Sequence, residues 1–116
     1  MDSILVRDLR VEVLIGIHKR ERHVAQIVSI DLDIGIPGTT VFATDRVADT
    51  IDYEQVALRI QGLAGSGHFK LVETFAERIA KLLIDDFQAP WVKVSAAKIG
   101  ILPNAKSVGV SIERRR

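Results

Sequence analysis

The stretch Val28-Ser-Ile-Asp-Leu-Asp-Ile-Gly-Ile36 alternates between apolar residues and polar or small ones. A period of two is typical of a β-strand with one buried face, as found in antiparallel sheets. The residues from Val11 to His18 alternate in the same way, and the polar stretch His18–His23 between the two segments predicts a turn. Pro37-Gly38 ends the second strand. The sequence therefore predicts two paired strands in the first third of the chain.

Two helices are predicted in the middle of the chain. The first begins at Asp52, because Asp52 and Gln55 resemble a capping box, and it ends in the glycine-rich stretch 62–67. That stretch lacks the Gly-Lys-Ser/Thr ending of a phosphate-binding loop. The second helix carries an apolar stripe at helical spacing, formed by Leu71, Phe75, Ile79 and Leu82.

The last quarter returns to period two. One predicted strand places four residues on its inner face, namely Val92, Val94, Ala96 and Lys98. The final strand points Val108, Val110 and Ile112 inward. The order β-β-α-α-β-β predicts an α+β fold, with a four-stranded antiparallel sheet and two helices on one of its faces. The open edges of such a sheet favour pairing with other copies, so we expect a homo-oligomer.

Composition limits the possible functions. The 116 residues are 47% hydrophobic and 27% charged, which predicts one globular domain spanning residues 1–116. The formal net charge of +1 provides no electrostatic footprint for nucleic acid, and the run Arg114–Arg116 is interpreted as a solvated tail. The sequence has no cysteine, no signal-peptide pattern and no membrane-spanning stretch, so we expect a cytoplasmic protein without a membrane partner. The three histidines, His18, His23 and His68, have no convincing metal spacing, so no metal is expected.

Lys98 is the most unusual residue, because it continues the buried face of a predicted strand. A desolvated lysine exchanges protons more readily near neutral pH, so Lys98 is a candidate catalytic group. The spacing leaves one alternative open. The strand could end here, and the ammonium group would then extend into water.

Three further polar residues are candidates, each with an ordinary alternative. Glu73 lies in the first turn of the second helix, where it either complements the helix dipole or accepts paired N–H donors from a ligand. Tyr53, the only tyrosine, either packs its ring or relays a proton. Glu21 and Gln26 flank the entry to the second strand and, taken alone, form an ordinary polar turn.

The order of these features resembles the dihydroneopterin aldolase family. The resemblance rests on Gly16-Ile-His-Lys-Arg-Glu21 followed by Gln26, on Asp52-Tyr53, on the block from His68 to Ala80 containing Val72-Glu73, and on a last block. The last block comprises Pro90-Trp91-Val92, Lys98 and Val108-Gly-Val-Ser-Ile-Glu-Arg114. The resemblance covers almost the whole chain. It implies the tunnelling fold, in which sheets of several subunits join into a barrel, and an octamer of two tetrameric rings with active sites between subunits.

The same resemblance implies a carbon–carbon lyase of folate biosynthesis that needs no cofactor. The family cleaves 7,8-dihydroneopterin, a small pterin, into 6-hydroxymethyl-7,8-dihydropterin and glycolaldehyde. Glu73 and the backbone of Val72 would bind the amino-pyrimidine edge, and Tyr53 of a neighbouring subunit would bind substrate and relay a proton. Lys98 would be the general acid/base, and Glu21 would contact the ligand or an ordered water molecule.

One departure and two alternatives accompany this interpretation. Many members have proline after the lysine, whereas Ile99 follows here and keeps an N–H that proline would remove. A dihydroneopterin triphosphate epimerase would share the same motifs, and Lys19, Arg20 and Arg22 are candidate phosphate-binding residues. The other alternative is a non-catalytic pterin- or purine-binding protein built on the same barrel.

Overall fold

The computed structural model describes residues 1–116. Its strands are β1 (Ser3–Ile15), β2 (Gln26–Gly35), β3 (His68–Phe69), β4 (Trp91–Ile99) and β5 (Ser107–Arg115). Its α-helices are α1 (Val41–Thr44), α2 (Tyr53–Ala64) and α3 (Val72–Asp86). Two short 3-10 turns complete the order: η1 (Lys19–Arg22) lies between β1 and β2, and η2 (Val47–Asp49) lies between α1 and α2. The α+β class predicted from the sequence is confirmed.

The sheet has five strands in the order β3-β1-β2-β4-β5, so the predicted count of four was wrong. The four long strands pair antiparallel, as predicted, and β3 adds a short parallel pairing of His68 and Phe69 to Leu14 and Ile15. A two-residue strand is too short to show any periodicity, and its partner lies far away in the sequence. Its consequence is local: β3 brings the start of α3 to the end of β1.

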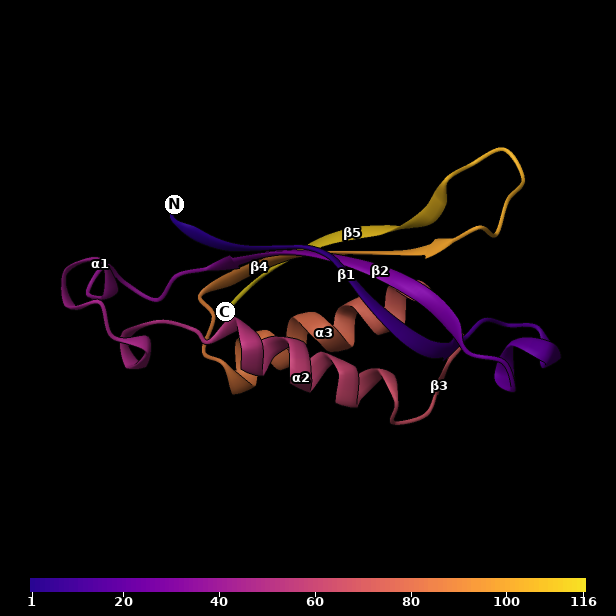
Figure 1. The fold of residues 1–116 in the computed structure, drawn as a ribbon, viewed down its shortest axis with the longest axis horizontal. Helices are drawn as coiled ribbons and strands as arrows, with labels where there is room; N and C mark the ends of the chain where they lie inside the picture. Colours follow the sequence, from indigo (N-terminus) through magenta and orange to yellow (C-terminus); the bar gives the residue numbers. More distant parts are fainter.

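The helices α2 and α3 cover the same face of the sheet (Figure 1). The buried apolar side chains of β2 all belong to the predicted inner face: Val28, Ile30, Leu32 and Ile34. The buried stripe of α3 is Phe75, Ala76, Ile79, Ala80 and Leu83. Leu71 was predicted in this stripe but is the exposed N-cap of α3, because the helix begins only at Val72. None of the helices is long and apolar enough to span a membrane.

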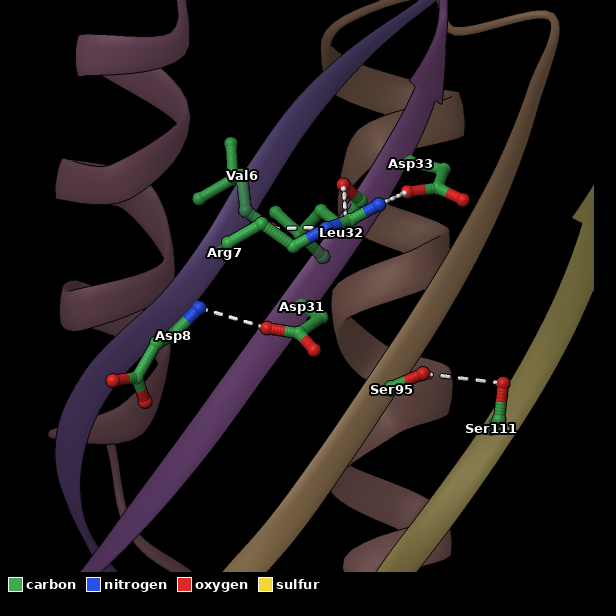
Figure 2. A network of polar contacts seen from close by, with 8 residues as sticks. All are labelled: Val6, Arg7, Asp8, Asp31, Leu32, Asp33, Ser95 and Ser111. Atoms are coloured by element: carbon green, nitrogen blue, oxygen red, sulfur yellow. Dashed lines mark hydrogen bonds and ion pairs between the residues drawn. The ribbon is translucent and has the colours of Figure 1, made fainter.

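The other face of the sheet is polar (Figure 2). Arg7 reaches Asp33 at 2.6 Å, and the Ser95 hydroxyl donates to the Ser111 hydroxyl at 3.1 Å. The register of β1 shifts between Val6 and Leu9, and within this bulge the Asp8 N–H donates to Asp31 at 2.7 Å. Charged and hydroxyl side chains on this face leave the core to the helix-covered side.

Three local predictions differ from the structure. Asp52 caps α2 by accepting from the N–H of Glu54, so no capping box forms with Gln55. Val108 is 43% exposed, because the β4–β5 hairpin extends past the helices that cover the rest of the sheet. The C-terminal arginines are not a free tail: Arg114 lies in β5 and pairs with Glu77 at 2.9 Å.

Candidate active site

Lys98 and Glu21 form an ion pair at one end of the sheet. The Lys98 Nζ atom lies 3.0 Å from Glu21 Oε2, and the two side chains are only 15% and 14% exposed. Lys98 comes from β4, and Glu21 comes from the turn η1 between β1 and β2. An ion pair that is largely shielded from water holds the Lys98 side chain at a defined position beside the carboxylate.

The strand register places Lys98 on the helix-covered face of the sheet. Its Cα partners are Val28 in β2, which is fully buried, and Val108 in β5. The structure therefore agrees with the core-facing phase and not with a side chain extended into water. Ile99 continues the strand by pairing with Ser107, and the chain leaves the sheet only at Gly100, whose φ is +75°.

Glu21 accepts three hydrogen bonds from groups on different segments. Gln26 Nε2 donates to Oε2 at 2.9 Å, Lys98 donates to the same oxygen, and the His18 N–H donates to Oε1 at 3.2 Å. The hydrogen bond from Gln26, followed by that from Lys98, lowers the pKa of the Glu21 carboxyl to about 2. Glu21 is therefore a carboxylate at neutral pH.

Gly16 makes room for that carboxylate. A Cβ atom at this position would lie 2.1 Å from Glu21 Cδ, and the φ of +141° already disfavours any side chain. Two contacts hold Gly16 in place. The Gly16 N–H donates to the Phe69 carbonyl at 2.9 Å, and His68 Nε2 lies 2.9 Å from the Gly16 carbonyl oxygen. Gly16, Gln26 and His68 belong to the motifs on which the family resemblance rests. Nothing in the sequence pattern predicted these contacts, however.

Glu73 and Val72 stand at the start of α3, which follows β3 directly. Glu73 is exposed and makes no ion pair or side-chain hydrogen bond within the chain. The N–H of Val72, the first helical residue, has no intrahelical acceptor. A free carboxylate beside a free N–H suits a planar group that offers two donors and one acceptor along one edge.

Tyr53 lies at the far end of α2, away from β3 and Gly16. It is 61% exposed and begins α2, whose other end leads into β3 beside Gly16. The helix has 12 residues, so Tyr53 lies about 18 Å away along it. Figure 1 shows α2 running from the region of the chain termini toward β3. Within one copy, Tyr53 cannot reach Lys98.

An open cleft lies beside the ion pair. It is lined by His18, Arg20, Glu21, Val24, Gln26, Gly100 and Ile101. Of the three basic residues considered for phosphate binding, Arg20 alone lines this cleft. Glu21 thus contacts the Lys98 amine and also lines an open cleft.

The fold and these groups define a class of protein: an α+β protein with a shielded lysine–glutamate ion pair beside an open cleft and a separate exposed carboxylate at the start of α3. The sequence profile of the dihydroneopterin aldolase family matches residues 4–113. The dihydroneopterin aldolase of Escherichia coli K12 is 32% identical over 114 residues, which cover 98% of this chain and 93% of that protein. The enzyme of Streptococcus pyogenes serotype M6 is 29% identical, with both chains covered completely.

Solved structures show the same similarity to dihydroneopterin aldolases. The Escherichia coli dihydroneopterin aldolase in complex with neopterin superposes with a TM-score of 0.92 at 32% identity and covers 98% of this chain and 99% of that chain. A urate oxidase from Bacillus sp. TB-90 shares the fold alone, with a TM-score of 0.66 at 12% identity over 45% of its chain. The chain belongs to the dihydroneopterin aldolase family. The predicted family and the predicted class of function, a carbon–carbon lyase of the aldolase type, are therefore confirmed.

Proposed function

We propose that this chain cleaves 7,8-dihydroneopterin into 6-hydroxymethyl-7,8-dihydropterin and glycolaldehyde, and that the Lys98–Glu21 pair carries the reaction. The observation behind this proposal is the ammonium group held 3.0 Å from a carboxylate at the wall of an open cleft. The family membership provides the substrate class.

The chemistry requires proton transfer more than electrophilic activation. The C=N bond of the dihydropterin ring, once protonated, accepts the electron pair of the breaking C–C bond, so the reaction needs neither a lysine Schiff base nor a cofactor. A proton must leave the side-chain hydroxyl that becomes the aldehyde, and another must reach the resulting enamine. We assign these transfers to Lys98, assisted by Tyr53, with Glu21 contacting the ligand or an ordered water molecule.

Glu73 and the Val72 N–H would bind the pterin edge. The pyrimidine part of a pterin offers two N–H donors and a carbonyl acceptor side by side, which match the free carboxylate and the free N–H at the start of α3. The complex of the 32% identical Escherichia coli enzyme with neopterin supports a pterin as ligand.

The site would be completed by a second copy of the chain. The edge of β5 is unpaired, and β3 covers only Leu14 and Ile15 of the β1 edge, so both ends of the sheet can pair with other copies. Large apolar side chains such as Phe42 and Val47 are exposed outside the sheet. We propose a cytoplasmic homo-octamer of two tetrameric rings, in which Tyr53 of one subunit reaches the Lys98 of its neighbour.

Arg20 favours one alternative, an epimerase that acts on the triphosphate of dihydroneopterin. A guanidinium group in the cleft beside Glu21 could bind a phosphate of such a substrate. A non-catalytic pterin- or purine-binding protein would need only Glu73 and the Val72 N–H at the start of α3, and not the Lys98–Glu21 pair.

Product identification separates the three functions. The protein is incubated with 7,8-dihydroneopterin and, separately, with its triphosphate, and the products are identified by chromatography and mass spectrometry. Release of glycolaldehyde supports the aldolase, and stereoisomer formation without cleavage supports the epimerase. Binding without any conversion supports the non-catalytic protein and contradicts the proposal.

A further inference from the structure

Gln26 occupies a position where the strand pattern calls for an apolar residue. It opens β2 in the phase of Val28 and Ile30, which are fully buried, and it pairs with Val13 of β1 on the helix-covered face. Lys98 pairs with Val28 and lies on the same face. The end of the sheet therefore carries two polar side chains, Gln26 and Lys98, where the interior of the sheet carries aliphatic ones.

The amide nitrogen of Gln26 is fully used. Nε2 donates to the Ile15 carbonyl at 2.6 Å and to Glu21 Oε2 at 2.9 Å. Both partners are acceptors only, so the orientation of the amide follows from its neighbours and cannot be reversed. One hydrogen bond fixes the Gln26 amide to the main chain of β1. The other holds the Glu21 carboxylate against this fixed amide.

Glu21 needs such an anchor because its own segment provides little. The turn η1 has four residues, none of them buried. Without Gln26, the carboxylate would keep only the His18 N–H of its own exposed turn, at 3.2 Å, and a lysine with a flexible stem, so it would be poorly located relative to the sheet. Gln26 shares Oε2 with Lys98, so it also determines where the ammonium group rests.

We propose that Gln26 is a positioning residue, which fixes the Glu21 carboxylate against the sheet and thereby sets the place of the Lys98 ammonium group. This inference rests on the proposed function for its catalytic consequence, since the placement of Lys98 matters for turnover only if Lys98 transfers protons. Its structural part, the anchoring of Glu21 by a donor, is independent of the substrate.

A purely structural role would be different. Gln26 would then only donate to the Ile15 carbonyl, and any loss of activity on substitution would be explained by a loss of stability.

Two variants with side chains of similar length separate the two roles. Gln26→Met removes the donor at every pH. Gln26→Glu places a second carboxyl beside Glu21, where two carboxylates repel each other and one of them is protonated at higher pH than usual. Once protonated, the new carboxyl donates to Glu21 again.

The other charged or titratable groups around this site are few. Lys98 approaches from β4, His18 and Arg20 come from the segment around η1, and His68 of β3 contacts the Gly16 carbonyl. All of them are identical in the two variants, so a difference between the pH profiles of Gln26→Met and Gln26→Glu reports on position 26.

The test uses the assembled wild-type protein and both variants, each checked for an unchanged thermal transition. Glycolaldehyde release from 7,8-dihydroneopterin is measured from about pH 5 to about pH 9. We expect Gln26→Met to lower kcat about tenfold to a hundredfold at every pH, with KM changed little, because a small misplacement is costly for catalysis. Gln26→Glu should match that loss at high pH and regain activity relative to wild type as the pH falls.

A second readout keeps the inference testable if the protein shows no aldolase activity. The Glu21 carboxyl is titrated by carbon NMR in glutamate-labelled protein, with Glu21→Gln identifying its signal. Gln26→Met should raise the titration midpoint from its low value. An inactive wild type with this shift would mean that the proposed function is wrong and the positioning role holds. A Gln26→Met variant with unchanged kcat and an unchanged midpoint would overturn the positioning role.

Discussion

Lys98 Nζ lies 3.0 Å from Glu21 Oε2, although 77 positions separate the two residues along the chain. Their side chains are largely shielded from water, so each charge depends on the other for compensation. Removing either side chain leaves the charge of the other one uncompensated in a site that is shielded from water. Substitutions in this pair, in the residues that hold it in place and in the groups proposed to bind substrate should therefore have different effects.

Lys98→Ala should lower kcat by about 10²- to 10⁴-fold, the range typical of a lost general acid or base. Pterin affinity should stay within about tenfold (~1.4 kcal/mol), because Glu73 would carry the binding. Steady-state kinetics and ligand titration measure the two effects. Lys93→Ala is the matched control, since Lys93 is exposed on the opposite face of the same strand. An undiminished rate in Lys98→Ala would rule out its catalytic role.

Glu73→Gln should weaken pterin binding about tenfold or more, because the amide replaces a charged acceptor of two N–H donors. Isothermal titration with neopterin measures the change. Glu54→Gln is the control: Glu54 also lies in the first turn of a helix, so it tests the alternative that Glu73 acts only on the helix dipole. Equal affinity of wild type and Glu73→Gln would contradict the binding role.

Gly16→Ala should reduce both activity and stability. The new methyl group would meet the Glu21 carboxylate, and the backbone is already in a conformation that favours glycine. We expect a stability loss of about 1–3 kcal/mol, by denaturant unfolding, together with a large drop in kcat. Gly38→Ala is the control, because Gly38 also has positive φ but no atom lies within 4 Å of the added carbon. Its stability should fall while its kcat is retained.

Glu21 should contribute to the acid sensitivity of the fold. Its pKa is lowered from 4.5 to about 2 in the folded chain, so its ionised form stabilises the fold at pH values above about 4.5. That contribution is lost as the pH falls toward 2, since the unfolded chain takes up the proton first. Glu21→Gln should therefore be less stable at neutral pH and lose less stability between these pH values.

Unfolding by urea at a series of pH values measures this effect. Glu12→Gln, on the exposed side of β1, is the control and should follow the wild-type curve. A Glu21→Gln curve that runs parallel to wild type across the acidic range would contradict the assignment.

Mixed oligomers test the placement of Tyr53 in a neighbouring subunit. Tyr53→Phe and Lys98→Ala chains are co-expressed with two different tags, and the hybrid assemblies are purified on both. If each site takes Lys98 from one subunit and Tyr53 from another, random mixing restores about a quarter of the sites. A mixture of Lys98→Ala with Glu21→Ala is the control, since both residues come from the same chain and no site should recover. Absence of recovery in the first mixture would contradict the shared site.

The strands were predictable because burial of one face is written locally in the sequence. Val28, Ile30 and Leu32 alternate with polar residues whatever the rest of the chain does, and the same rule put Lys98 on the inner face. The start of α2 was predicted correctly at Asp52. The predicted capping partner was wrong, because the Asp52 carboxylate has more than one N–H within reach.

Long-range contacts were not readable in this way. The two residues of β3 carry no period, and they form a strand only because β1 passes beside them. The spacing of Glu21, Gln26 and Lys98 left each one with an ordinary interpretation, and their meeting on a single carboxylate oxygen depends on how η1 folds against β2 and β4. Gly16 is required by the position of Glu21 in space, five residues away along the chain yet in contact with it. Periodic burial is a property of neighbouring residues, whereas hydrogen bonds between separate segments exist only once the sheet has assembled.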